Sequence, residues 1–197
     1  MQYLIKQYTL EQGALEIQYI EEFFNEFTRR KTADEIIGRL AGRQHLILMA
    51  EVASPDDPAM FLPVSYKVSH ELRVRETEPK LKDLVERLVD HVDFSGRRVL
   101  YSWIGGTRSD WRGRGHFRAL TEEQEAWAVN VGFHEILVKT RNRFYDMRGT
   151  LDSLRYDVVK YEPHHVDNRD SKVYLSKQLG AEVLREHRSR RKVVQVG

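Results

Sequence analysis

A short segment rich in arginine and glycine, in the middle of the chain, has the residue types best suited to binding an anion. It reads Arg-Gly-Arg-Gly-His-Phe-Arg over residues 112–118. Glycines let the backbone approach a ligand closely, and the unpaired amides and dipole at the start of a following helix favour negative charge. Arg112, Arg114 and Arg118 add positive charge, and a guanidinium can hold two phosphate oxygens at once. The segment therefore predicts a pyrophosphate site, with an ordinary tight turn bearing exposed arginines as the alternative.

Two other phosphate-binding motifs do not fit this segment. The P-loop spacing with its Lys-Ser/Thr pair is absent, which argues against nucleotide hydrolysis. The dinucleotide pattern fails because Phe117 interrupts the glycine run and no early parallel strand–helix–strand unit precedes it. The phosphate chemistry expected here is therefore binding by a turn and a helix start, without the machinery of a nucleotidase.

Cysteine and histidine usage limits the other chemistry. The chain has no cysteine, which excludes disulfides, thiolate catalysis and zinc held by cysteine. His164 and His165 are adjacent, and on a strand they would point to opposite faces, so we expect no metal site. His116 has two interpretations, as a helix cap or as a contact to phosphate.

The segments around the turn predict an α+β fold. We expect strands at residues 3–8, 45–53, 60–71, 98–104, 135–140, 158–161 and 173–175, with Gly105-Gly106 ending the fourth. Helices are expected over the apolar repeats Ile17–Phe27, 81–92, 117–131 and 144–154, and after Thr32, where Glu35 completes a capping box. This order predicts an α/β/α sandwich around one mixed, mostly antiparallel sheet.

Composition and charge indicate one soluble domain over residues 1–197. No apolar run approaches the roughly twenty residues needed to cross a bilayer, and the first residues lack the basic start and apolar stretch of a signal peptide. We therefore expect a cytoplasmic protein without a membrane partner. Positive charge gathers near residues 108–118 and 187–192, but the net charge is only +2. Nucleic-acid binding is thus the least favoured interpretation, since no recognisable nucleic-acid motif accompanies this charge.

Residues 98–180 resemble the GNAT family of acetyltransferases. The coenzyme loop of that family reads Gln/Arg-x-x-Gly-x-Gly/Ala, which Arg112 and Gly115 match and from which Phe117 departs. Tyr-Ser-Trp-Ile-Gly-Gly-Thr at 101–107 looks like the strand that enters this loop. The segment 139–144 resembles the family's next strand with its asparagine, and 173–177 resembles the closing strand. The segment 154–159 stands where relatives often have a Gly-Phe pair, which is missing here.

The resemblance implies a splayed pair of strands that holds the pantetheine arm of acetyl-CoA. Ile104, Gly105 and Thr107 would pair with this arm as an added strand would, and Asn142 would lie beside it. The pyrophosphate would be bound by the turn residues Arg112, Gly113, Arg114, Gly115, His116, Phe117 and Arg118. The implied activity is direct acetyl transfer, through a tetrahedral intermediate, to an amine of a small molecule or a peptide, without a metal.

The resemblance leaves the acid and the base open. Many relatives have a tyrosine seven residues after the asparagine, where this chain has Gly149. Tyr145 is the nearest hydroxyl, and Tyr101 is a second candidate. Ser102 and Glu51 are also considered, because an amine with a pKa of roughly 10 must lose a proton before it attacks. A catalytically silent acyl-CoA sensor is the alternative function.

A helical insertion is expected at about residues 79–94, between the hairpin and the strand that enters the coenzyme loop. Its apolar stripe consists of Leu81, Leu84, Val85, Leu88, Val89 and Val92, so the helix must pack on something. We expect it to cover the substrate side and to shape specificity. A helix that only thickens the core and a homodimer contact are the alternatives.

Overall fold

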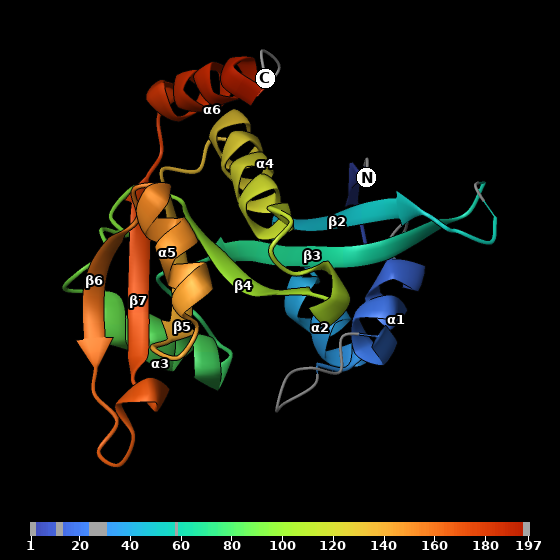
Figure 1. Ribbon diagram of the computed structural model, residues 1–197. Helices are drawn as coiled ribbons and strands as arrows, with labels where there is room; N and C mark the ends of the chain where they lie inside the picture. The colour runs from blue at the N-terminus through green and yellow to red at the C-terminus, as the bar shows by residue number, and fades with distance from the viewer. Residues whose placement is uncertain (1–2, 11–13, 24–30, 58, 195–197) are drawn as a thin grey trace. The chain divides into compact units, whose positions relative to one another are not determined.

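The computed structural model describes residues 3–10, 14–23, 31–57 and 59–194, with the backbone alone for residues 14, 23 and 188–194 (Figure 1). Its strands are β1 (Leu4–Tyr8), β2 (His45–Ala53), β3 (Phe61–Leu72), β4 (Val99–Thr107), β5 (Glu135–Arg141), β6 (Asp157–Glu162) and β7 (Lys172–Gln178). Its α-helices are α1 (Ala14–Phe23), α2 (Ala33–Leu40), α3 (Pro79–Leu88), α4 (His116–Asn130), α5 (Tyr145–Ser153) and α6 (Ala181–Val194). Among the described residues the strands follow the order β1-β2-β3-β4-β5-β7-β6 in one sheet.

The chain divides into two compact units. The first comprises Met1–His70 and Trp103–Gln124, and the second comprises Glu71–Ser102 and Glu125–Gly197. The backbone passes between the units three times, inside β3, inside β4 and inside α4. The single domain expected from the sequence stays a prediction.

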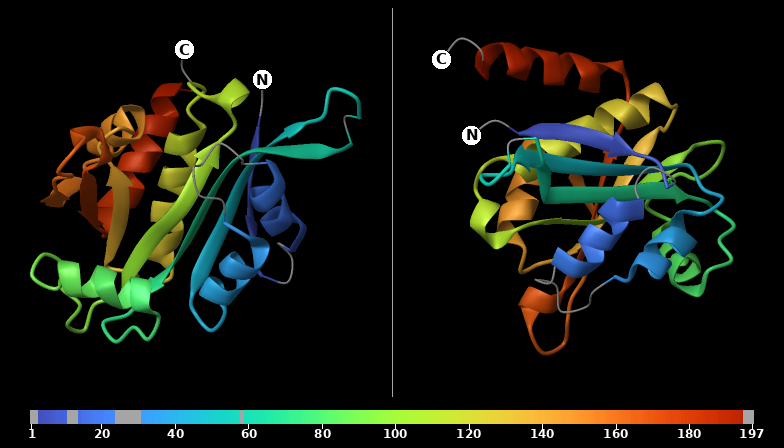
Figure 2. Two further views of the ribbon diagram at one scale, coloured as in Figure 1. Left: turned by 90° about the horizontal axis from the view of Figure 1, so that it is seen from below. Right: turned by 90° about the vertical axis from the view of Figure 1, so that its right-hand side faces the viewer.

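In the first unit, β1, β2 and β3 form an antiparallel sheet with helices on both faces. The helices α1 and α2 lie on one face of β2 and β3, and the start of α4 lies on the other (Figures 1 and 2). α2 begins with the expected capping box, in which the Thr32 side chain accepts from the Glu35 amide and the Glu35 carboxylate accepts from the Thr32 amide. The core on the α1–α2 side comprises Ile17, Ile20, Ile36, Leu40, Ile47, Met49, Tyr66 and Val68.

β3 has an apolar face and a polar face, and both are buried. Tyr66 and Val68 belong to the core under α1 and α2. Their neighbours Ser65, Lys67 and Ser69 point to the opposite face by strand alternation, and each of the three is at most 3% exposed. A polar row on a strand usually predicts a solvated face, so the burial of this row could not be read from the sequence.

In the second unit, β7 lies between β5 and β6 and is antiparallel to both. β4 pairs with β5 in parallel, with Val99 opposite Glu135 and Ser102 opposite Val138. α3 and α5 cover opposite faces of these strands (Figure 2). The α+β class and the mixed, mostly antiparallel sheet are thus confirmed, while the splaying of two strands stays a prediction.

Two expectations about where elements end are wrong. β4 continues through Gly105 and Gly106 to Thr107, because the neighbouring strand provides hydrogen bonds that outweigh the low strand preference of glycine. α3 ends at Leu88 and is followed by a turn. Val89 is 55% exposed and therefore does not belong to the buried stripe. The role of α3 in specificity stays a prediction.

The described residues include one α-helix that the sequence pattern did not indicate. Some expectations fall on residues outside the described ranges and cannot be compared with the structure. α6 occupies residues 181–194, where we expected only a basic tail. Phe24 and Phe27 of the first expected helix lie outside the described residues, as do the side chains of 188–192 in the basic tail. None of the described helices is both long and apolar enough to cross a membrane.

Candidate functional site

The segment between β4 and α4 forms an open turn that ends on a helix amino terminus. Gly113 and Gly115 have φ angles of +75° and +81°, values at which side chains are strained. A Cβ atom built on either glycine would meet nothing within 4 Å. The Gly115 carbonyl accepts the first helical bond, from Ala119 at 3.0 Å. The backbone amides between Gly115 and Ala119 come before this bond and have no acceptor within the helix. The turn therefore presents hydrogen-bond donors and open space at the positive end of α4.

The arginines of this turn contact residues close to them in the sequence. The Arg114 guanidinium lies 4.3 Å from the centre of the Trp111 ring and donates to the Asp110 carbonyl at 3.2 Å. Arg112 reaches back to the Thr107 carbonyl at 3.4 Å. Arg118 pairs with Glu122 one helical turn later, at 3.4 Å. The turn thus has a cationic rim, and Glu122 offsets part of its charge.

His116 is the first residue of α4, and its ring is buried under the turn. It packs edge-on to Tyr3 at 4.5 Å and stacks on Trp111 at 5.9 Å, measured between ring centroids. Burial, with the positive charge of Arg114 in second place, lowers the pKa of His116 below its ordinary value. The Nδ1 atom is buried and has no hydrogen-bond partner among the described residues. Of the two interpretations of His116, the side-chain cap is not seen, and contact with phosphate stays a prediction.

Phe117, the residue that departs from the family pattern, lies above a buried lysine. The Lys67 ammonium is 4.5 Å from the centre of the Phe117 ring and donates to the Thr121 hydroxyl at 2.7 Å. The Thr121 hydroxyl in turn donates to the Phe117 carbonyl at 2.7 Å. Sequence analysis missed Lys67, because one lysine in an alternating strand gives no signal that a helix will cover it.

The end of β4 is held against β3 by short-range contacts. Ser65 donates to the Gly106 carbonyl at 2.9 Å, and its hydroxyl is 2.7 Å from that of Thr107. A Cβ atom at Gly105 would lie 3.0 Å from the Tyr66 carbonyl, so a side chain there would force the two strands a few tenths of an ångström apart. Residues 103–107, which include Ile104, remain half-exposed. Pairing of this stretch with an extended ligand stays a prediction.

Asn142 links three segments of the second unit. Its backbone amide donates to the Ser171 carbonyl at 2.9 Å, and its side-chain Nδ2 donates to the Asn168 carbonyl at 3.1 Å. Arg148 of α5 donates to its Oδ1 atom. The side chain therefore fixes the loop between β5 and α5, and a role beside pantetheine stays a prediction.

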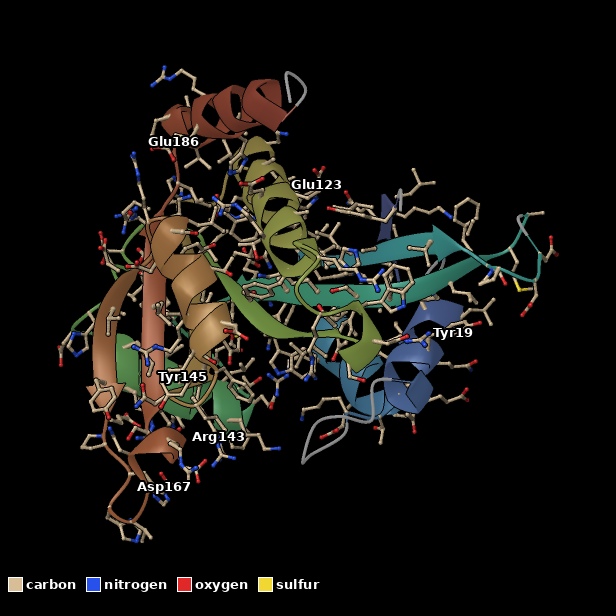
Figure 3. The ribbon with its side chains drawn as sticks, viewed as in Figure 1. Tyr19, Glu123, Arg143, Tyr145, Asp167 and Glu186 are labelled. Carbon is tan, nitrogen blue, oxygen red and sulfur yellow. The ribbon has the colours of Figure 1, made fainter. Side chains whose placement is uncertain are left out.

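The two tyrosines considered for catalysis lie in different environments. Tyr145 is the first residue of α5 and is 59% exposed (Figure 3). Tyr101 lies in β4 and is 7% exposed. Gly149, at the position of the tyrosine of many relatives, lies inside α5. Tyr145 is thus exposed and Tyr101 buried, and both catalytic roles stay predictions.

His164 and His165 do not lie on a strand, so the expectation that strand alternation points them to opposite faces is wrong. β6 ends at Glu162, and the rings of His164 and His165 stack with centroids 4.9 Å apart. Over the described parts of the chain, no three His, Cys, Asp or Glu side chains are grouped as a metal site requires.

Known structures of acetyltransferases resemble this chain. Arabidopsis thaliana NAA60 in complex with a bisubstrate analogue has a TM-score of 0.66 and 11% identity, over 91% of this chain and 99% of that one. A GNAT superfamily phosphinothricin acetyltransferase from Sinorhizobium meliloti, in complex with AcCoA, has a TM-score of 0.63 and 12% identity, over 91% and 90%. The ribosomal-protein-S18-alanine N-acetyltransferase from Escherichia coli has a TM-score of 0.59 and 9% identity, over 91% and 95%. No protein-family model and no curated protein matches the sequence. The chain therefore has the fold of the GNAT acetyltransferases.

Proposed function

We propose that this protein is an N-acetyltransferase that uses acetyl-CoA as its cosubstrate. The observation that carries the proposal is the open turn at residues 113–118, where two glycines with positive φ lead directly into the amino terminus of α4. Such a turn binds a pyrophosphate through backbone amides. The fold supports the same assignment, because the similar structures include an acetyltransferase in complex with AcCoA.

The turn fits the phosphates of the coenzyme in shape and charge. Side chains at Gly113 and Gly115 would fill the space that the phosphates need, and none is present there. Arg112 and Arg114 provide positive charge on the rim. The half-exposed residues Ile104, Gly105 and Thr107 would pair with the pantetheine arm along β4, and Asn142 would contact the same arm.

Acetyl-CoA supplies an activated acetyl group when it is bound. The acceptor amine forms the new N–C bond before the C–S bond breaks, and over the two steps one proton leaves the amine and one is taken up by the sulfur. Tyr145, which is exposed, is the candidate donor to the sulfur, because it has the hydroxyl nearest in sequence to the family's tyrosine position. Tyr101 is a candidate base for the amine proton, although it is buried. The amine proton leaves through a water chain or a nearby base.

The acceptor is an amine of a small molecule or a peptide. The similar structures include enzymes of both kinds, since one is a phosphinothricin acetyltransferase and another acts on an alanine of ribosomal protein S18. The first helices, the β2–β3 hairpin and α3 carry no recognisable motif that selects between the two classes. The proposal therefore covers both classes.

Release of free CoA thiol in the presence of an amine panel tests the proposal. The panel includes polyamines, amino acids and short peptides with free amino termini. Because the chain has no cysteine, a thiol reagent reports only on the CoA that is released. We expect release that depends on both the enzyme and an amine. Binding of acetyl-CoA without release by any amine would contradict transfer and favour a sensor.

A further inference from the structure

β5 carries a half-buried lysine, Lys139, on the face of the sheet that α3 covers (Figure 2). The next residue, Thr140, points to the other face, because its hydroxyl donates to the Met147 sulfur of α5 at 3.5 Å. Side chains alternate along a strand, so Lys139 points toward α3. Its partner across the strands is Tyr174 of β7, whose ring centre lies 5.7 Å from the Lys139 ammonium. All of these residues belong to the second unit.

The carboxylates that act on Lys139 are paired with other cations. Asp83 and Glu162 attract the Lys139 ammonium electrostatically. Asp83 pairs with Arg87 at 2.8 Å. Glu162 pairs with Arg87 at 3.1 Å and with Lys172 at 3.2 Å. Lys139 itself forms no ion pair with any residue that the structure describes.

The charged residues under α3 form a cluster with an excess of positive charge. Its members are the cations Arg87, Lys139, Lys160 and Lys172 and the carboxylates Asp83 and Glu162. Burial, with the charge of Lys172 in second place, lowers the pKa of Lys139 below its ordinary value. A bound anion beside the Lys139 ammonium would oppose both effects, because it favours the charged form.

The proposed function brings the thioester of acetyl-CoA to this part of β5. The pantetheine arm would follow β4 from Thr107, beside the diphosphate turn, back to Ile104. Its thioester end would then lie near Ser102, where the pairing of β4 with β5 ends opposite Val138. Lys139 is the next residue of β5. An acceptor amine that approaches from the face of α3 would therefore come close to the Lys139 ammonium.

We propose that Lys139 binds a carboxylate of the acceptor, so that the preferred substrates are amines that also carry an acid group. The inference rests on the proposed function and names its substrate class. In a half-buried place, a hydrogen bond between an ammonium and a carboxylate is stronger than in water. Among the described members of the cluster, only the Lys139 ammonium has neither a carboxylate nor a carbonyl as its partner. This one cation matches the single charge of a carboxylate, whereas a phosphate dianion would need a second.

Matched acceptors with and without an acid group test the inference. Glycine, β-alanine and γ-aminobutyrate carry the carboxylate at increasing distance from the amine, and their amides carry a neutral group of similar size. Short peptides that begin with aspartate or asparagine form a further pair. For each pair, the kcat/KM of the acid is divided by that of the neutral acceptor, in the wild type and in Lys139→Met. The change in this ratio between the two proteins isolates the contact, because differences between the amines themselves cancel.

Lys139→Met keeps the length of the side chain and removes its charge. We expect the ratio to fall about tenfold for at least one pair, which is the effect of losing one hydrogen bond between charged groups. The kcat/KM of the neutral acceptors should stay close to that of the wild type. Equal ratios in the two proteins for every pair would overturn the inference.

Further variants separate charge from packing. Lys139→Arg keeps the positive charge and should retain most of the preference for acids. Lys139→Gln is a second neutral variant, which provides the comparison if Lys139→Met does not fold. Lys82→Met removes an exposed lysine of α3, which lies 3.9 Å from Glu86, and should leave every ratio unchanged. A loss in Lys139→Arg as large as in the neutral variants would contradict a role of the charge.

The wild type distinguishes failure of the inference from failure of the proposed function. A wild type that transfers acetyl to no amine of the panel would refute the proposed function, and the inference with it. A wild type that acetylates acids and neutral acceptors with the same ratios as Lys139→Met would refute only the role of Lys139.

Discussion

The Nε2 atom of His187 lies 2.8 Å from the Oε2 atom of Glu125, and both side chains are buried. The same carboxylate oxygen accepts from the Lys177 ammonium at 2.7 Å. Glu125 belongs to α4, Lys177 to β7 and His187 to α6, so one buried carboxylate links three elements of the second unit. This network explains how α6, whose sequence is largely polar, is attached to the rest of that unit.

Replacement of Glu125 by glutamine should strongly destabilise the protein. The change leaves the Lys177 ammonium buried without its counter-charge, and breaking a buried pair in this way costs about 3 kcal/mol or more. Denaturant unfolding followed by circular dichroism would measure the loss. Glu86→Gln, on the exposed side of α3, is the control and should stay within about 0.5 kcal/mol of the wild type. A Glu125→Gln variant as stable as this control would show that the network adds no stability.

The contribution of Glu125 to the unfolding free energy should also depend on pH. Burial alone would raise its pKa, but the hydrogen bond from His187 and the charge of Lys177 outweigh burial and lower the pKa below the ordinary value of 4.5. A carboxylate with a lowered pKa in the folded state stabilises the protein fully above its unfolded pKa, and the effect is lost as the pH falls through the folded value. The difference in unfolding free energy between wild type and Glu125→Gln should therefore shrink as the pH falls below about 4.5. A difference that grows over this acid range would contradict the assignment.

The contribution of the α2 capping box to the stability of the first unit can be tested independently. Thr32→Ala removes the side-chain acceptor for the Glu35 amide and should cost about 1 kcal/mol of unfolding free energy. Thr32→Ser keeps the acceptor and should recover most of this loss. Chemical denaturation of the three proteins in parallel measures both effects, and equal stability of the alanine and serine variants would rule out the cap.

The elements with a strong local signal were predictable from the sequence. The capping box at Thr32 and Glu35 located the start of α2, and the apolar run at 45–53 coincides with β2. Boundaries set by neighbours were not predictable. β4 runs through two glycines because β3 lies alongside it, and α3 ends before Val89 although the apolar pattern continues.

The candidate site could be located from the sequence, but its support could not. The turn at 112–118 is a local pattern, so its glycines and the start of α4 followed from residue types alone. Lys67 and Glu125 act through contacts with segments more than fifty residues away. A charged residue in a strand or helix gives no sign of burial until the tertiary structure is known.

Replacement of Gly115 by valine should weaken coenzyme binding beyond its effect on stability. A β-branched residue is strained at a φ of +81°, and its side chain would occupy the open space of the turn. Gly42→Val provides the matched control, because Gly42 has a φ of +67° and equally open surroundings in the turn after α2. Both variants should lose about 1–3 kcal/mol of stability. Only Gly115→Val should lose affinity for CoA by calorimetry, and equal CoA affinities in the two folded variants would place the diphosphate elsewhere.

The most direct test of the central claim is titration calorimetry of acetyl-CoA into the wild-type protein. We predict one binding site per chain, with a melting temperature that rises as acetyl-CoA is added, because a ligand that binds only the folded state stabilises it. Binding should weaken when the phosphates are absent, as in acetyl-pantetheine. The absence of both binding heat and thermal stabilisation at millimolar acetyl-CoA would contradict the assignment of this chain as an acetyl-CoA-dependent enzyme.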